Sequence, residues 1–153
     1  MTDWRALLTG IRTRSPEETE ALGQALACAM PDDSVLALHG DLGAGKTTFV
    51  RGLARGLGIR ETIRSPSFNL YFIYQGKRQL VHCDAYRLED SSDFDDLLLE
   101  DFLQPPWILA LEWPERACSP LLGDAWHLHL ALDVETQAHH LRLEQPPRPG
   151  ASR

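Results

Sequence analysis

The segment Gly40–Thr47, with the sequence GDLGAGKT, constrains the fold of this chain more than any other feature. It matches the pattern GxxxxGK[ST] at every fixed position. A short apolar run at 34–39, typical of a buried strand, comes before it, and a segment at 46–57 with apolar residues at helical spacing follows it. A strand, a glycine-rich turn and a helix in this order predict an α/β domain with a partly parallel sheet.

The same segment predicts a site for the phosphates of a nucleotide. Its glycines let the backbone curl so that several N–H groups face phosphate oxygens, and the following helix adds the positive end of its dipole. Lys46 is expected to reach the β- and γ-phosphates, the Thr47 hydroxyl to ligate magnesium, and Thr48 to lie near the α-phosphate. The residues expected to bind the nucleotide are Asp41, Leu42, Gly43, Ala44, Gly45, Lys46, Thr47 and Thr48.

Two acidic residues follow apolar strands and are candidates for the chemistry. Asp84 comes after the run at 80–83, and Glu112 comes after the run at 108–111. Ligands of open α/β sheets lie outside the carboxyl ends of the parallel strands, so both acids are placed to bind magnesium or to orient the attacking water. Which of them orients water stays open, and the alternative for each is a solvated acid at a strand end. The predicted catalytic residues are Lys46, Asp84 and Glu112, and the predicted magnesium ligands are Thr47, Asp84 and Glu112.

Other polar residues near the loop have two interpretations each. Asp41 either faces the γ-phosphate region or points to solvent. Ser65 and Ser67 flank a proline, and they either bring two hydroxyls near the nucleotide as a switch-like loop or form an ordinary turn. Trp113 is expected to pack rather than to contact a ligand. Surface positions are favoured over a role as an arginine finger for Arg64, Arg87 and Arg116.

The rest of the chain predicts further helices and two hairpins. Ser15 is the expected N-cap of a helix, with Pro16 at its first position and Glu18 closing a capping box. Strands are expected at 68–74, 79–84, 107–111, 126–134 and 138–143, and an acidic amphipathic helix at 90–103. The predicted fold is a single P-loop NTPase domain over residues 1–144, with a mixed parallel and antiparallel sheet flanked by helices, followed by a disordered tail at 145–153.

Composition narrows the class of protein and its surroundings. The chain has 153 residues and a net charge of −7, which suits one compact domain and argues against an autonomous nucleic-acid binder. It contains no apolar run of roughly 18 to 20 residues, the length needed to cross a bilayer, and no secretory signal pattern. We therefore expect a cytoplasmic protein without a membrane partner.

Cysteines and histidines give no clear sign of a metal site. Cys28, Cys83 and Cys118 are widely spaced and are expected to be reduced thiols. On strands, His127 and His129 would share one face, whereas His139 and His140 would point to opposite faces. Since no carboxylate or thiol lies near them at ligand spacing, solvated strand histidines are favoured over metal ligands.

Two other classes of nucleotide-binding protein need sequence features beyond the glycine-rich loop. A small-molecule kinase with a P-loop needs an acceptor pocket and an arginine-bearing lid, and the sequence has no arginine-rich lid segment. A GTP switch needs a guanine-reading NKxD motif, which is absent from the sequence. ATP with magnesium is therefore the expected ligand, and the small-molecule kinase stays as the alternative function.

Four motifs together resemble a known family. HGDLGAGKTTFVRGLARGLGI, SPSFNLYFIY, HCDAYRL and LEWPER, in this order and spacing, are similar to the bacterial tRNA threonylcarbamoyladenosine biosynthesis ATPases of the TsaE (YjeE) family, over residues 15–143. The resemblance implies Lys46 and Thr47 on the phosphates and magnesium, Asp84 at the metal, and Glu112 near the γ-phosphate. The chain departs from the family pattern at Ser67, at Ala85 and at 97–99, where three leucines replace a segment that commonly carries glycine.

The resemblance also implies a biological role. Members of this family are weak ATPases that dock on the transferase subunit and its paralogous partner (TsaD and TsaB type). That complex attaches a threonylcarbamoyl group to adenosine 37 of tRNAs decoding ANN codons, and the resemblance implies that ATP hydrolysis resets it between cycles. The tRNA would then be contacted only indirectly, through the partners.

Overall fold

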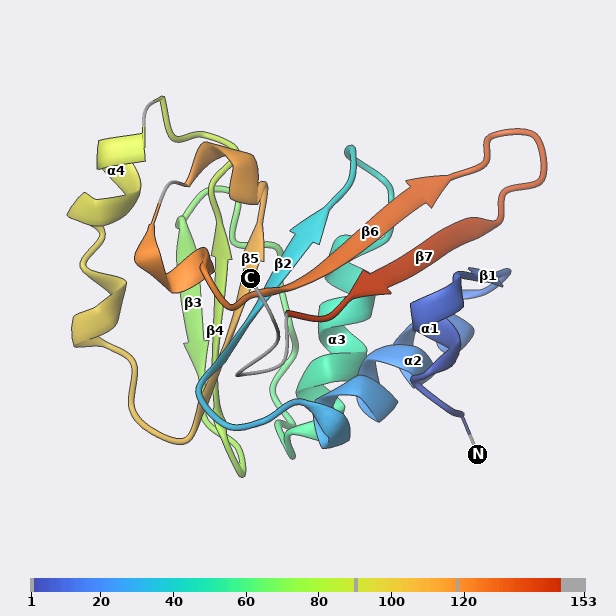
Figure 1. Cartoon of the computed structure of the whole chain (residues 1–153), viewed down its shortest axis with the longest axis horizontal. Helices are drawn as coiled ribbons and strands as arrows, with labels where there is room; N and C mark the ends of the chain where they lie inside the picture. The colour runs from blue at the N-terminus through green and yellow to red at the C-terminus, as the bar shows by residue number, and fades with distance from the viewer. Residues whose placement is uncertain (1, 90, 118, 147–153) are drawn as a thin grey trace, which may run out of the picture.

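The computed structural model describes residues 2–89, 91–117 and 119–146, which form an α/β fold around one seven-stranded sheet. The strand order is β1-β7-β6-β2-β5-β4-β3 (Figure 1). The strands are β1 (Ile11–Thr13), β2 (Ser34–His39), β3 (Tyr71–Tyr74), β4 (Gln79–Asp84), β5 (Trp107–Glu112), β6 (Trp126–Leu132) and β7 (His139–Glu144). The helices are α1 (Ala6–Thr9), α2 (Pro16–Ala29), α3 (Lys46–Gly56) and α4 (Ser91–Asp96), with 3-10 turns at Leu99–Asp101, Pro114–Arg116 and Pro120–Leu122.

The sheet is mixed, as predicted. Strand β2 is parallel to β5 on one side and to β6 on the other, and β5 is parallel to β4. The β3–β4 and β6–β7 pairs are antiparallel hairpins, and β1 adds to the outer edge of β7. Parallel neighbours put their carboxyl ends at the same edge of the sheet. The ends of β2, β4 and β5 therefore meet where the glycine-rich segment begins.

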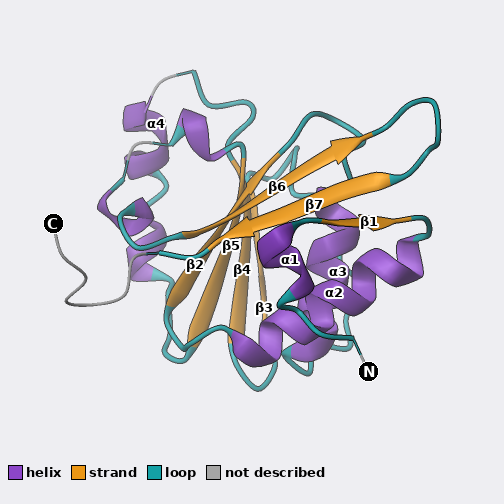
Figure 2. Cartoon of the chain, turned by 45° about the vertical axis from the view of Figure 1, so that its right-hand side comes forward, coloured by secondary structure: helices purple, strands orange, loops and turns teal. Residues whose placement is uncertain are grey.

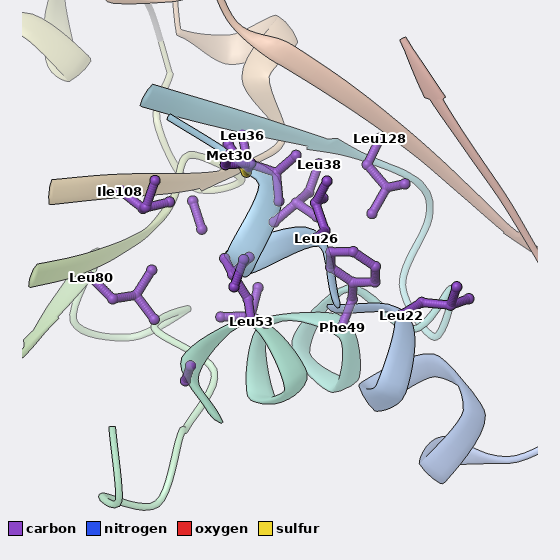
Figure 3. Close-up of a cluster of buried hydrophobic side chains, with 14 of the residues drawn as sticks. Leu22, Leu26, Met30, Leu36, Leu38, Phe49, Leu53, Leu80, Ile108 and Leu128 are labelled. Atoms are coloured by element: carbon purple, nitrogen blue, oxygen red, sulfur yellow. The ribbon is translucent and has the colours of Figure 1, made fainter. Parts of the chain in front are cut away.

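Both faces of the central strands are buried. Successive side chains of a strand point to opposite faces, so each strand contributes to two cores. Leu36 and Leu38 of β2 join a core with helices α2 and α3, and Figure 3 shows Phe49 of α3 among these side chains. Val35 and Ala37 face the other way, into a second core that includes Phe94 of α4. Helices α1–α3 thus cover one face and α4 the other (Figure 2). Burial of each such leucine stabilises the folded state by about 2 kcal/mol.

The helix start predicted at Ser15 is confirmed with a small difference. The Ser15 side chain accepts a hydrogen bond from the Glu18 backbone N–H at 3.2 Å, and Pro16 begins α2. The Glu18 carboxylate reaches back as expected, but it accepts from the N–H of Arg14 at 2.7 Å, one residue before the cap. These bonds satisfy N–H groups that the first turn of a helix leaves without partners.

The predicted acidic helix at 90–103 is wrong in its length. Of the described residues in this range, Ser91–Asp96 alone is α-helical. Leu98 then takes the left-handed conformation with φ 51°, and a 3-10 turn follows over Leu99–Asp101. Leu99 is buried in the second core, whereas Leu98 is 60% exposed. Burial of Leu99 on the sheet therefore overrides helix propensity, a preference worth only tenths of a kcal/mol per residue.

Other boundaries also differ from the sequence prediction. Strand β3 begins at Tyr71 and not at 68, because residues 67–70 form a turn that ends with Leu70 at φ 69°. Helix α1 and strand β1 were not predicted, since each is shorter than the patterns that hydrophobic periodicity detects. None of the described helices is long and apolar enough to cross a membrane. Most of the tail predicted at 145–153 lies outside the described residues, as does Cys118.

The two cysteines that the structure describes are free thiols, as predicted. Cys28 is exposed, whereas Cys83 of β4 is buried beside Asp84. Burial raises the pKa of the Cys83 thiol to about 12, and the neighbouring carboxylates add to this effect. A thiol in this state is unreactive at neutral pH, so Cys83 has a packing role.

Candidate functional site

The glycine-rich segment forms a tight loop between the end of β2 and the start of α3. Gly40, Gly43 and Gly45 have φ values of 153°, 82° and 105°, in the region that favours glycine. At Gly40 the loop also passes close to strand β6, where an added Cβ would lie 2.5 Å from the backbone oxygen of Leu130. The loop therefore has the strand–turn–helix context that the sequence motif requires.

Lys46 begins α3 and folds back over the loop. Its ammonium donates a hydrogen bond to the backbone oxygen of Gly40 at 2.6 Å and lies 3.9 Å from Oε1 of Glu112. The same nitrogen lies 4.1 Å from the ring centre of Trp113, within range of a cation–π contact. Burial lowers the pKa of Lys46, while the carboxylates of Glu112 and Asp84 oppose this effect. The site thus holds a buried cation next to the backbone of the loop.

Asp84 and Glu112 lie side by side at the carboxyl edge of the sheet. They are register partners at the ends of the parallel strands β4 and β5, and Glu112 is also level with Leu38 of β2. Both are almost fully buried, at 5% and 4% exposure. A buried carboxylate is costly unless it has partners, so the contacts of these two acids define their roles.

Asp84 is held by the neighbouring loops. Its Oδ1 accepts the backbone N–H of Tyr86 at 2.9 Å, and its Oδ2 accepts the hydroxyl of Ser67 at 3.0 Å. The hydroxyls of Ser65 and Ser67 are 2.8 Å apart. The loop at 65–67 therefore contacts the site through Asp84, so it is more than an ordinary turn.

Glu112 is held by a histidine from the adjacent strand. Its Oε2 accepts a hydrogen bond from Nε2 of His82 at 2.6 Å, and His82 is completely buried. Nδ1 of His82 has no hydrogen-bond partner among the described residues. One carboxylate oxygen is therefore fixed by the imidazole, while the other is directed toward Lys46.

These groups border one cleft of about 350 Å³. It is lined by Leu42, Gly43, Gly45, Lys46, Thr47, Thr48, Ser65, Ser67, Asp84, Glu112, Trp113 and His139. Of the residues expected to bind nucleotide, Asp41 and Ala44 do not line it. Asp41 is exposed, and the methyl group of Ala44 is buried in the core beneath the loop. Arg64, Arg87 and Arg116 are exposed and do not line it either.

Two cleft residues, Trp113 and His139, and the buried His82 behind Glu112 had no functional role in the sequence prediction. Trp113, expected only to pack, lines the cleft and covers Lys46. His82 was part of an apolar run, and only the strand register places it against Glu112. His139 was expected to be solvated, but it is partly buried and its Nδ1 lies 2.7 Å from the backbone oxygen of Ala44. No signal in the sequence pairs these three residues with Glu112, Lys46 or Ala44, because each contact joins segments that are distant along the chain.

Three further histidines, His39, His127 and His129, form a separate cluster beside the loop. Nε2 of His39 is 2.9 Å from Nδ1 of His127, and the ring of His39 stacks on that of His129 at 4.5 Å. Burial and the two neighbouring rings lower the pKa of His39, while Glu115 and Glu144 oppose this effect. Within the described ranges no three His, Cys, Asp or Glu side chains converge in a way that could hold a metal ion.

The chemistry of the cleft suits a polyanion with a hard cation. Backbone N–H groups, a helix N-terminus and Lys46 offer positive potential, whereas Asp84, Glu112 and the Thr47 hydroxyl offer oxygen ligands. Magnesium usually takes one or two carboxylates and completes its shell with water and substrate phosphate, so it does not need a closed protein cage. The donor set of the cleft therefore fits a magnesium–nucleotide complex.

Comparison with known proteins gives consistent similarities. Residues 13–142 match the family model described as "Threonylcarbamoyl adenosine biosynthesis protein TsaE". A Treponema pallidum protein named tRNA threonylcarbamoyladenosine biosynthesis protein TsaE is 41% identical over 109 residues, which cover 71% of this chain and 81% of that protein. A Bacillus subtilis protein of the same name is 44% identical over 103 residues, covering 67% of this chain and 64% of that protein. The crystal structure of Bacillus subtilis YdiB superposes with a TM-score of 0.72 at 28% identity, covering 90% of this chain and 85% of that one.

Proposed function

The chain belongs to the TsaE family, and from this membership we propose that it binds ATP with magnesium and hydrolyses it in support of threonylcarbamoyladenosine formation at position 37 of tRNA. The observation that carries the proposal is the convergence of Lys46, Asp84 and Glu112 with the glycine-rich loop in one cleft. Three distant segments of the chain meet there. The groups they bring are those that phosphoryl transfer requires, namely a phosphate cradle, a cation and acids near the metal.

In this proposal, phosphates are bound by the loop and by Lys46. The Lys46 ammonium already lies inside the loop, 2.6 Å from the backbone oxygen of Gly40, and a short movement brings it to a phosphate oxygen. Trp113 lies over the ammonium and keeps water from one side of it. Because the site is largely buried, the attraction between Lys46 and phosphate is stronger than it would be in water.

Thr47, Asp84 and Glu112 would hold magnesium, which supplies neutralisation of charge on the phosphates when it is bound. Asp84 is anchored by Tyr86 and Ser67, so it keeps its place at the strand end. Among the described residues, His82 anchors Glu112 through one oxygen, and the other oxygen faces Lys46. This asymmetry favours Glu112 over Asp84 as the acid that orients the attacking water.

The proposed partners are the transferase subunit and its paralogue, of the TsaD and TsaB type. Large apolar side chains are exposed around the cleft, with Leu42 73% exposed, Phe68 82% and Tyr86 40%. Leu42 lines the cleft, Phe68 follows Ser67 of its lining, and the Tyr86 ring packs on Trp113. Exposed apolar side chains around one cleft are typical of a surface that binds another protein. A partner on this surface would cover the nucleotide and make hydrolysis depend on the complex, and it would contact the tRNA itself.

The test is phosphate release from ATP and from GTP, each with magnesium, with and without the two transferase partners. We expect slow hydrolysis of ATP by the chain alone, faster hydrolysis with the partners, and little activity with GTP. Lys46→Ala is the control for activity from this cleft. Rapid phosphorylation of a small metabolite without the partners would replace the proposal with a kinase, and a failure to bind ATP would remove it altogether.

A further inference from the structure

His139 contacts the glycine-rich loop from the side opposite to Asp84 and Glu112. It is the first residue of β7, and its Nδ1 lies 2.7 Å from the backbone oxygen of Ala44. Its ring is half-buried and borders the cleft beside Gly45. The contact joins residues 95 positions apart, so it exists only when the β6–β7 hairpin is packed on the loop.

The chemistry of this contact fixes the state of the ring. A carbonyl oxygen can only accept a hydrogen bond, so Nδ1 of His139 must carry the proton and donate it. In a trans peptide the C=O and the following N–H point in opposite directions. A hydrogen bond that holds the Ala44 carbonyl toward the ring therefore also holds the N–H of Gly45 away from it, and Gly45 is one of the residues that line the cleft.

Steric contacts support the same arrangement. A Cβ on Gly45 would lie 3.3 Å from Nδ1 of His139, so the ring rests directly on the Cα of this glycine. At the other end of the loop, a Cβ on Gly40 would lie 2.5 Å from the backbone oxygen of Leu130 on β6, which is closer still. The β6–β7 hairpin thus supports the loop at its first and last glycines, and His139 is the side chain that adds a hydrogen bond to this support.

We propose that His139 is a positioning residue that fixes the Ala44–Gly45 peptide in the orientation in which the loop accepts phosphate. This inference rests on the proposed nucleotide site, because it assigns a role within that site. His139 acts through the backbone and not on the reacting atoms. Its loss therefore weakens nucleotide binding more than it slows the bound nucleotide's hydrolysis.

The test compares four variants by their dissociation constants for magnesium ATP and by kcat. His139→Ala and His139→Phe remove the donor, and phenylalanine keeps a ring of similar size. We expect either change to weaken binding about 5- to 10-fold, the range for one lost hydrogen bond, with kcat changed less than 3-fold. His139→Asn retains a donor near the Nδ1 position and should restore binding to within about 3-fold of the wild type.

His140→Ala is the matched control, because the next residue of β7 points to the opposite face of the sheet. It should bind magnesium ATP as the wild type does. If the wild type binds and His139→Phe binds equally well, the positioning role is wrong while the proposed function stands. If the wild type itself binds no nucleotide, the proposed function fails first.

A measurement on the nucleotide-free wild type tests the proposal without any variant. Nitrogen-15 NMR of the imidazole rings should find His139 with its proton on Nδ1. The amide resonance of Gly45 should shift in His139→Phe and stay in place in His140→Ala. A wild-type His139 that is protonated only on Nε2 would overturn the inference, whatever the stability of the variants.

Discussion

The glycine-rich loop is flanked by two walls of different chemistry. The acidic wall consists of the ends of β4 and β5, with Asp84 and Glu112 as buried charges. The hairpin wall consists of β6 and β7, where Leu130 and His139 touch the backbone of the loop. One wall directs side-chain charge into the site, whereas the other holds main-chain geometry through a hydrogen bond from His139 and close packing.

This difference predicts two kinds of defect. Charge that acts on a developing transition state changes kcat, whereas a change in the shape of the loop alters ground-state and transition-state binding alike. Substitutions in the acidic wall should therefore slow turnover with little loss of affinity. Substitutions in the hairpin wall should weaken affinity with little loss of turnover.

The largest effect is expected from Lys46→Ala, between the two walls. Its ammonium contacts the loop backbone at Gly40 and lies near Glu112, so its removal takes away phosphate binding and leaves Glu112 without its nearby cation. We expect turnover to fall by at least about 100-fold, as when one preorganised electrostatic group is lost from an active site. Phosphate release at saturating ATP measures it, and a variant within 10-fold of the wild type would contradict the role of Lys46.

Glu112→Ala tests the role of the acidic wall in turnover. We expect kcat to fall about 100-fold or more, with affinity for ATP changed only a few-fold, because an acid that orients water acts in the transition state. His82→Asn is the companion variant, since it removes the imidazole that holds Oε2 of Glu112 and should lower kcat by a smaller factor. Steady-state kinetics measures kcat and equilibrium binding measures the affinity for ATP. A normal rate for Glu112→Ala would remove this residue from the mechanism.

Gly45→Ala tests the role of the hairpin wall in nucleotide affinity. The φ of 105° is unfavourable for alanine, and the added Cβ would press on the ring of His139 at 3.3 Å. We expect affinity for magnesium ATP to fall about 10-fold, because the loop must shift to relieve both the strain, roughly 1 to 2 kcal/mol, and the contact with the ring. Gly43→Ala is the control, because Gly43 also has a positive φ but an added Cβ there meets nothing within 4 Å. Equal losses in both variants would show that strain alone matters and that the hairpin contact does not.

The smallest effect is expected outside both walls, at Leu98. This residue is 60% exposed and has φ 51°, so Leu98→Gly relieves an unfavourable conformation with little loss of buried surface. The free energy of unfolding should rise by about 0.5 to 1 kcal/mol, with hydrolysis unchanged. Chemical denaturation measures the gain, and a loss of stability would mean that the Leu98 side chain packs more than its exposure suggests.

Local patterns in the sequence predicted much of the fold. The loop at Gly40–Thr47, the cap at Ser15 and the strands that end in Asp84 and Glu112 all lie where their residues indicate. The four motifs also led to the TsaE family, and the family match over 13–142 confirms that resemblance. The helix expected at 90–103 failed because periodicity does not reveal where the chain must bend to bury Leu99.

The sequence by itself thus determined the class of ligand, because GxxxxGK[ST] and acids at strand ends are local patterns with a direct chemical meaning. Only the tertiary structure decided how the acids are held and what supports the loop. His82 meets Glu112 through the register of β4 on β5, and His139 meets Ala44 because β7 lies beside the loop. These contacts join positions 30 and 95 residues apart, and no local pattern of residues encodes which distant side chains will meet when the sheet forms.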